Sequence, residues 1–235
     1  MTYPGGKNGS GAYQRIISNM PPHDCYVEAF LGSGAVLRNK RPAARNIAID
    51  ADQKAINLCQ SLGGDRPDIE FIKGNALKLI SSPVLKCLAN PKTLAYFDPP
   101  YVMETRKGGE LYDHELSDQD HIDLLTLLSG LPCMMMLSGY RSSMYDVALQ
   151  DWHRIDYMTQ TRQGMVEECL WMNFAQPAEL HDYSHLGDGF RERERIKRKK
   201  TRWTKKIANM DRLERLAIMD VLINETGKQQ HASHT

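Results

Sequence analysis

The sequence lacks a long apolar run, and its cysteines lack a pattern. No apolar stretch in the 235 residues approaches the roughly 20 that span a bilayer. The first ten residues, MTYPGGKNGS, lack the apolar centre of a signal peptide. Five cysteines, an odd number without a C-x-x-C pair, argue against a disulfide framework or a zinc site. We therefore expect a cytoplasmic protein with reduced thiols and no metal.

The net charge of +1 conceals an asymmetry along the chain. Residues 191–206, RERERIKRKKTRWTKK, hold ten Lys or Arg and two Glu, a local charge of +8, so the rest carries −7. Concentrated positive charge of this kind is typical of a contact with a polyanion, and a solvated charged helix gives the same pattern. The remaining composition, 41% hydrophobic and 25% charged, is that of an ordinary globular protein.

Strand-like and helix-like segments alternate from residue 25 to about residue 140, which predicts an α/β fold with a mostly parallel sheet and flanking helices. The expected strands lie near 25–30, 46–52, 69–77, 93–101 and 133–140, followed by a closing pair near 152–160 and 167–174. The expected helices lie near 10–20, 35–41, 53–63, 117–131, 145–152, 190–210 and 211–224. We expect one domain over 1–176, a turn-rich linker over 177–189 and a basic helical extension over 190–235.

Two features at the ends of expected strands indicate a nucleoside cofactor. FLGSG (30–34) is a glycine turn, where missing side chains let a ligand approach the backbone. Asp50, 16 residues after Gly34, ends the next strand, where nucleoside-binding α/β folds place an acid for the ribose hydroxyls. The third glycine of G-x-G-x-x-G is missing, which argues against a dinucleotide and favours a cofactor without a pyrophosphate.

The stretch TLAYFDPPYVM (93–103) places an acid, two prolines and a tyrosine directly after an apolar strand. Proline cannot extend a sheet ladder, so the chain enters a stiff turn at Asp98. An exocyclic amine of a nucleobase is a poor nucleophile, because its lone pair is delocalised into the ring. Asp98 and the carbonyl of Pro99, held rigid by Pro100, can accept both amine hydrogens, and Tyr101 offers a face on which a flipped base can stack. The carboxylate also stabilises positive charge that develops on the nitrogen.

Four motifs occur in the order found in Dam-type DNA adenine methyltransferases, which the sequence resembles over about residues 3–174. They are Y-P-G-G-K (3–7), E-A-F-L-G-S-G (28–34), Asp50 and D-P-P-Y (98–101). The resemblance implies a Rossmann-like class I methyltransferase fold and an enzyme that uses S-adenosylmethionine to methylate the N6 amine of adenine. It also implies that the target base is flipped out of DNA, most simply out of a duplex.

The resemblance implies a role for each matching residue. The cofactor site would comprise Tyr3, Gly5, Lys7, Glu28, Phe30, Gly32, Gly34, Asp50, Asn75 and Asp98. Within it, Lys7 would meet the methionine carboxylate, Asp50 the ribose and Asn75 the adenine of the cofactor. Catalysis on the target base would fall to Asp98, Pro99, Pro100 and Tyr101.

The sequence departs from the family in one respect. Dam-type enzymes commonly carry a target-recognition domain between the third strand and the D-P-P-Y strand, whereas here only residues 78–92 lie between them. DNA contacts are therefore expected elsewhere. The expected contacts are Arg106, Lys107, Arg141, Lys197, Arg198, Lys199, Lys200 and Arg202. In the basic segment Ile196, Trp203, Ile207 and Met210 share one helical face, which leaves the basic side chains for phosphates.

Two alternative functions remain open from the sequence. Related tetrapeptides serve RNA methyltransferases, so an RNA adenine could be the target. A nucleic-acid-binding regulator that has lost the chemistry is the second alternative, and the retention of Lys7, Asp50 and Asp98–Tyr101 counts against it. Methylation of a protein amide is disfavoured, because enzymes of that kind usually have asparagine in place of Asp98.

Overall fold

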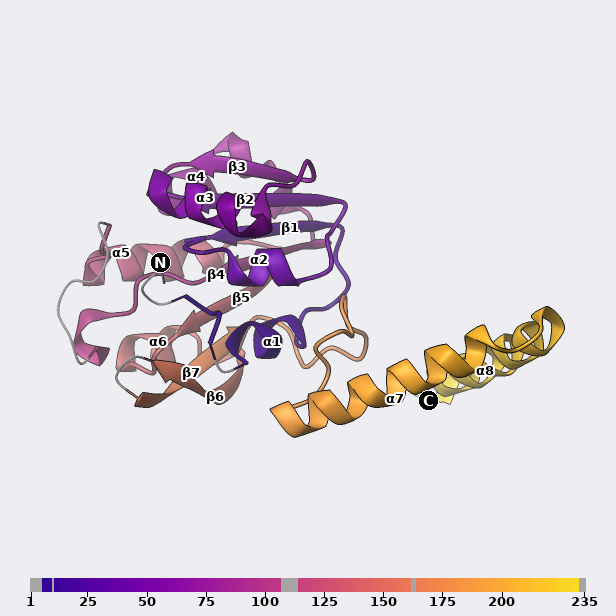
Figure 1. Cartoon of the computed structure of the whole chain (residues 1–235). Coiled ribbons are helices and arrows are strands. Elements are labelled where there is room, and N and C mark those ends of the chain that lie inside the picture. The colour runs from indigo at the N-terminus through magenta and orange to yellow at the C-terminus, as the bar shows by residue number, and fades with distance from the viewer. Residues whose placement is uncertain (1–5, 10, 107–113, 162–163, 233–235) are drawn as a thin grey trace. The chain divides into compact units, whose positions relative to one another are not determined.

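The computed structural model describes residues 6–9, 11–106, 114–161 and 164–232, and the chain divides into two units, 1–186 and 187–235. The first unit contains a seven-stranded sheet of order β3-β2-β1-β4-β5-β7-β6 (Figure 1). Strands β1 to β5 run parallel, and β7 is antiparallel to both β5 and β6. The strands are β1 Cys25–Ala29, β2 Arg45–Asp50, β3 Ile69–Lys73, β4 Thr93–Phe97, β5 Met134–Gly139, β6 His153–Thr161 and β7 Gly164–Met172. This topology confirms the predicted α/β, Rossmann-like class I methyltransferase fold.

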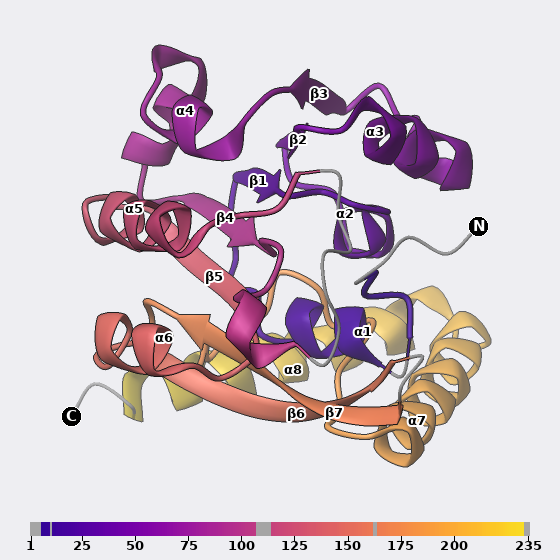
Figure 2. The same ribbon diagram turned by 90° about the vertical axis from the view of Figure 1, so that its left-hand side faces the viewer.

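Helices cover both faces of the sheet, because alternate strand residues point to opposite sides. Val27 and Phe97 pack with α4, α5 and α6, whereas Tyr26 and Tyr96 pack with α1, α2 and α3. Figure 2 shows the two helical layers with the sheet between them. The helices are α1 Ala12–Ile17, α2 Ala35–Asn39, α3 Gln53–Cys59, α4 Ala76–Ile80, α5 Asp118–Ser129 and α6 Ser143–Ala148, with 3-10 helices η2 Pro83–Ala89 and η3 Met103–Thr105.

Several element boundaries differ from the sequence prediction: β4 ends at Phe97 instead of 101, the last helix, α8 Arg212–Ala232, continues to Ala232 instead of 224, and two further differences change the type of structure. The expected strand over 69–77 ends at Lys73, and the Asn75 side chain accepts a hydrogen bond from the backbone N–H of Lys78 and so caps α4. The helix expected over 53–63 leaves α geometry after Cys59 and closes with the π-helical turn η1 Gln60–Gly64, in which Gly63 has a φ of 94°.

The connection between β3 and β4 consists of α4 and η2, and it packs into the core. Leu85 and Leu88 of η2 are 2% exposed and join the apolar cluster on that face of the sheet. This segment therefore completes the domain, and no target-recognition domain is inserted at this place, as the sequence indicates.

Part of the segment that was expected to be a linker packs on the first unit. The backbone N–H of His181 donates to the carbonyl of Met20 at 2.8 Å. The carboxylate of Asp182 accepts from the N–H of Arg41 at 2.9 Å, and the His181 ring stacks on His23 with ring centroids 3.8 Å apart. Residues 181–182 therefore belong structurally to the α/β unit.

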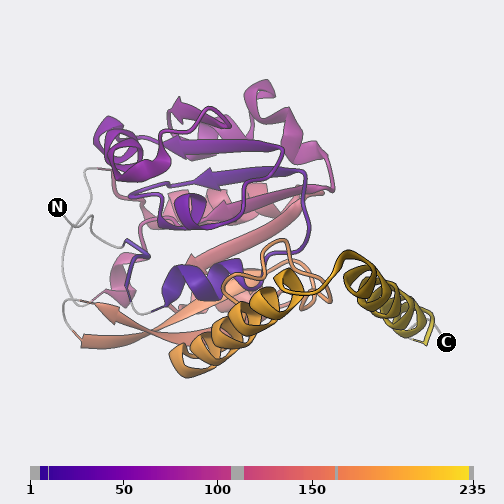
Figure 3. The same cartoon turned by 45° about the vertical axis from the view of Figure 1, so that its right-hand side comes forward.

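The second unit consists of two helices, α7 Phe190–Ala208 and α8 Arg212–Ala232, which Figure 3 shows in orange and yellow. The carboxylate of Asp211 accepts hydrogen bonds from the N–H groups of Leu213 and Glu214 and caps α8. Helix α7, which is described throughout, buries none of its side chains. Its charge therefore lies on a solvated surface.

The structure also bears on the state of the cysteines and on membrane-spanning helices. All five cysteines are free thiols, as the reduced state predicted from their spacing requires. Among the described residues, no helix is both long and apolar enough to cross a membrane.

Candidate active site

A cavity of about 470 Å³ lies at the carboxyl ends of the central parallel strands, where open α/β sheets bind their ligands. This volume is in the range of pockets that hold small molecules. The predicted site residues that line it are Lys7, Glu28, Phe30, Gly32, Asp50, Asn75, Asp98, Pro99, Pro100 and Tyr101. Tyr3 and Gly5 lie outside the described residues. The fold thus brings together residues that are up to 94 positions apart in the chain.

The turn after β1 has a left-handed backbone conformation, which residues other than glycine rarely adopt. Phe30 has a φ of 61°, and Gly32 and Gly34 have φ values of 53° and 63°. Left-handed backbone at a residue other than glycine is strained, and such strain is concentrated at binding sites. The strained conformation is kept, and in it the backbone N–H of Gly32 points toward Asp50 at the end of β2.

Gly34 has a different role from the other glycine of the turn, since it is not part of the cavity wall. A Cβ at this position would lie 2.3 Å from the Sγ of Cys59 on α3. Its glycine identity follows from the close packing of α2 against α3 and from its positive φ. Cofactor contact is not needed to account for it.

Asp50 is fixed by two backbone donors. Its Oδ2 accepts from the N–H of Gly32 and its Oδ1 from the N–H of Asp52, both at 2.8 Å. Burial raises the pKa of this carboxyl, and the two N–H donors oppose that shift. Each carboxylate oxygen that accepts one backbone N–H retains a further lone pair. Asp50 can therefore accept hydrogen bonds from a ligand's hydroxyl groups.

Glu28 and Asn75 line the same cavity but differ in burial and in their hydrogen-bond partners. Glu28 is 3% exposed and accepts a hydrogen bond from Tyr26 Oη at 2.7 Å. Burial raises the pKa of the Glu28 carboxyl to about 8, so at pH 7 it is mostly protonated. Asn75 is exposed by comparison and uses its Oδ1 as the cap of α4, which is a structural reason for an amide at this position.

The D-P-P-Y turn follows β4 at the wall of the cavity. Because Phe97 pairs with Ala29 in the parallel ladder, Asp98 lies beside the strained turn that begins at Phe30. The Asp98 carboxylate is 2.9 Å from the ammonium of Lys7. Burial raises the pKa of Asp98 to about 6, an effect that the positive charge of Lys7 opposes and the charge of Glu168 reinforces. Asp98 is therefore ionised at pH 7, yet more basic than an ordinary aspartate.

Lys7 lies between two carboxylates. Its Nζ is 2.9 Å from Asp98 Oδ1 and 3.2 Å from Glu168 Oε2, and it donates to the hydroxyl of Tyr101. Burial alone would lower the pKa of Lys7, but the two carboxylates outweigh it and hold the pKa well above its ordinary value. Lys7 is thus a fixed positive charge at the Asp98 end of the cavity, next to the predicted base-binding residues.

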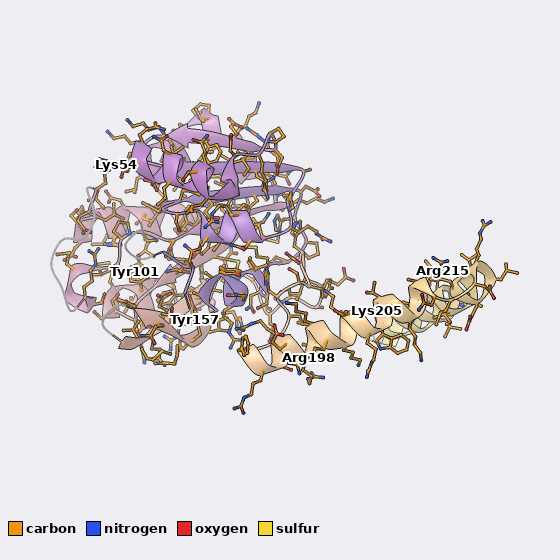
Figure 4. All side chains as sticks on the ribbon, in the orientation of Figure 1. Lys54, Tyr101, Tyr157, Arg198, Lys205 and Arg215 are labelled. Atoms are coloured by element: carbon orange, nitrogen blue, oxygen red, sulfur yellow. The ribbon has the colours of Figure 1, made fainter. Side chains whose placement is uncertain are left out.

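Three residues that the sequence did not single out complete this end of the site. Glu168 on β7 binds Lys7, and Tyr157 on β6 donates to Glu168 Oε2 at 3.0 Å. Tyr140, which follows β5, packs on Tyr101 with ring centroids 4.4 Å apart and an interplanar angle of 66°. Figure 4 labels Tyr101 and Tyr157 on the first unit. An aromatic residue directly after a strand was a usable signal for Tyr140, whereas Glu168 lies within a strand next to a second glutamate and gave none.

The predicted nucleic-acid contacts separate into two groups. Arg106 is 5% exposed; its guanidinium pairs with both carboxylate oxygens of Glu115, and its Nε donates to the carbonyl of Tyr101. Arg106 therefore holds the D-P-P-Y turn in place and offers little surface to a phosphate. Arg141 is 65% exposed and pairs with Asp146. Lys107 lies outside the described residues.

The other predicted contacts are on α7 in the second unit. Lys197, Arg198, Lys199, Lys200 and Arg202 are all exposed, and Arg198 is labelled in Figure 4. Of the predicted apolar face, Ile196, Ile207 and Met210 are half-buried, while Trp203 is 44% exposed with the Lys206 ammonium 5.4 Å from the centroid of its ring system.

Comparisons with known proteins give a likeness of fold. No family model and no curated protein sequence matches the chain. Among solved structures, the N-methyltransferase NodS from Bradyrhizobium japonicum WM9 is 10% identical with a TM-score of 0.49, covering 68% of this chain and 92% of its own. An rRNA methylase from Streptococcus thermophilus is 13% identical with a TM-score of 0.45, covering 68% and 93%. A precorrin 8w decarboxylase from Methanobacterium thermoautotrophicum is 12% identical with a TM-score of 0.42, covering 68% and 86%. At these identities and TM-scores nothing about the substrate of this chain follows from them, and its chemistry must be argued from its own site.

Proposed function

We propose that this protein is an S-adenosylmethionine-dependent methyltransferase that acts on the N6 amine of adenine in DNA. The observation that carries the proposal is that one cavity is lined both by the glycine turn with Asp50 and by Asp98 with Pro99. The first pair suits a nucleoside cofactor, and the second suits the amine of a nucleobase. The combination of Y-P-G-G-K and D-P-P-Y in the sequence supports adenine in DNA as the target.

The residues of the cavity fit the cofactor. Asp50 is held by two backbone N–H groups with lone pairs left for ribose hydroxyls. Glu28 suits the ammonium group of the methionine part, because a nearby cation favours the ionised form of a buried carboxyl. When bound, S-adenosylmethionine supplies an electrophilic methyl group on a sulfonium sulfur.

The chemistry that follows depends on Asp98 and Pro99. Their side-chain and backbone oxygens accept the two N6 hydrogens, which draws the nitrogen lone pair out of conjugation with the ring. With its lone pair freed in this way, N6 could take the methyl group that the cofactor, held by Asp50 and Glu28, would supply, and the electron pair of the broken methyl–sulfur bond would remain on the cofactor's sulfur. The surplus N6 proton passes to Asp98, whose pKa of about 6 suits acceptance from a cationic amine. Tyr101 and Tyr140 offer aromatic surfaces beside the flipped base.

We propose that the basic helix α7 supplies affinity for the phosphate backbone of the nucleic acid. Its exposed Lys and Arg residues can neutralise phosphates, which gives binding that depends steeply on salt and carries no sequence information. Both DNA and RNA offer phosphates to such a helix, so the choice between them has to come from an assay of methyl transfer.

The test is transfer of a radiolabelled methyl group to three substrates, namely duplex DNA without adenine methylation, single-stranded DNA and RNA. We expect N6-methyladenine in hydrolysed DNA, and none with Asp98→Asn, which controls for a contaminating enzyme. Label that appears in RNA alone would make the protein an RNA methyltransferase. Tight binding of the cofactor without transfer to any nucleic acid would favour the non-catalytic regulator.

A further inference from the structure

Glu168 is a buried carboxylate at the candidate site that the mechanism above does not use. Its side chain is 7% exposed and lies on the face of the β6–β7 ribbon that also carries Tyr157, its partner in the strand register. The neighbouring Glu167 belongs to the opposite face and is exposed. A charge is rarely buried without a partner, and here the partners are Lys7 and Tyr157.

The charges around the target amine explain what this carboxylate contributes. Lys7 and Asp98 by themselves form a neutral pair at 2.9 Å. Methyl transfer moves positive charge from sulfur onto N6, and a neutral pair gives that charge little net stabilisation. With the Glu168 carboxylate 3.2 Å from the same ammonium, the three groups together carry one negative charge. In a site that excludes water, a net negative charge stabilises the developing cation strongly.

We propose that Glu168 is a positioning residue that anchors Lys7 and supplies the net negative charge around the amine of the target base. This role rests on the proposed function. Glu168 acts through Lys7 and Asp98. It shares the Lys7 ammonium with Asp98, so that the positive charge of Lys7 is divided between two carboxylates and does not neutralise Asp98 completely. Tyr157 orients Glu168 through the hydrogen bond to Oε2. Asp98 therefore remains an effective acceptor for the amine while Lys7 stays in place.

The pH dependence of activity should show whether Glu168 influences the ionisation of Asp98. Within the part of the chain that the structure describes, the titratable groups that interact with Asp98 include Lys7, Glu28, Glu168 and the tyrosines Tyr26, Tyr96, Tyr101, Tyr140, Tyr145 and Tyr157. The pKa values of all six tyrosines are raised by burial, so they remain neutral throughout the range of interest. Removing the negative charge of Glu168 removes a repulsion that raises the pKa of Asp98, and the acid limb of the activity profile should move to lower pH.

The experiment compares Glu168→Gln with Tyr157→Phe and with the matched control Glu167→Gln, the same change at the adjacent exposed position. For Glu168→Gln we expect kcat to fall roughly 10- to 100-fold with little change in the KM for the cofactor, and the acid limb to shift down by about one pH unit. Tyr157→Phe keeps the charge and should lose only a few-fold in kcat without that shift. Glu167→Gln should behave as the wild type. A folded Glu168→Gln variant with wild-type kcat and an unmoved acid limb overturns the proposal.

Two further measurements keep the test decisive. If Glu168→Gln does not fold, Glu168→Asp retains the charge and should keep the acid limb of the wild type, so a shift as large as one pH unit in that variant refutes the proposal. The titration of the Asp98 carboxyl, followed by ¹³C NMR in the wild type and in Glu168→Gln, needs no activity. Absence of methyl transfer by the wild type would therefore refute the proposed function alone, while an Asp98 titration that is unaffected by the variant would refute the inference about Glu168.

Discussion

Replacing Glu28 by glutamine should stabilise the folded protein, and the gain should grow with pH. The carboxyl is fully buried, with a pKa of about 8 in place of 4.5. Because the pKa in the folded state is raised, the stability associated with this group is fully present below pH 4.5 and is lost as the pH rises through 8. The loss is about 1.4 kcal/mol for each pH unit between these limits, or roughly 3 kcal/mol at pH 7.

Glutamine removes this loss without removing the packing. Its amide oxygen can still accept the hydrogen bond from Tyr26 Oη, and its volume is nearly that of glutamate. The free energy of unfolding, measured by urea titration between pH 5 and 8, should therefore diverge from that of the wild type as the pH rises. Glu167→Gln, at an exposed strand position, is the control for a change of surface charge.

A difference between Glu28→Gln and the wild type that is independent of pH would refute the reasoning, as would a variant that is less stable at pH 8. The same variant should bind S-adenosylmethionine more weakly in calorimetry, because a neutral amide cannot pair with the ammonium of the cofactor. Glu28 would then serve ligand binding at the expense of stability, which is common at functional sites.

Four other outcomes are expected. Asp98→Ala should keep less than a tenth of the turnover with an intact fold, and Tyr101→Ala should impair turnover more than Tyr101→Phe; a ranking in the other direction would make the hydroxyl more important than the ring. Asp50→Ala should weaken cofactor binding in calorimetry by roughly 1.5–3 kcal/mol, the size of charge-assisted hydrogen bonds, and an unchanged affinity would remove Asp50 from the site. Replacing all four residues 197–200 by Ala should lower DNA affinity and flatten its salt dependence while cofactor binding stays intact. If affinity and salt slope survive that replacement, the DNA surface lies elsewhere.

The sequence alone predicted the order of the seven strands and of most of the helices, because each of these has its own apolar period and its own end signals; it did not predict α4 or η2, which lie between β3 and β4. It also predicted which residues gather at one edge of the sheet. Glu28, Asp50 and Asp98 each lie in or just after a strand, and the carboxyl ends of parallel strands meet at one edge. Local chemistry was sufficient for these inferences, since two prolines directly after an apolar strand end the ladder and hold the acid and the tyrosine beside them in a stiff turn.

The tertiary structure decided the partners of these residues. The pairing of Tyr157 with Glu168 depends on the register of β6 and β7, and a shift of one residue would turn Glu167 toward Lys7 instead. In the same way, Gly34 serves helix packing because α3 places Cys59 against it, and the guanidinium of Arg106 is paired with the carboxylate of Glu115, nine positions further along the chain. Such contacts join segments that are distant in the sequence or depend on a single register, so no local pattern encodes them. The sequence therefore determined which chemical groups stand at the edge of the sheet, and packing determined the charge and hydrogen bonding that each of them meets there.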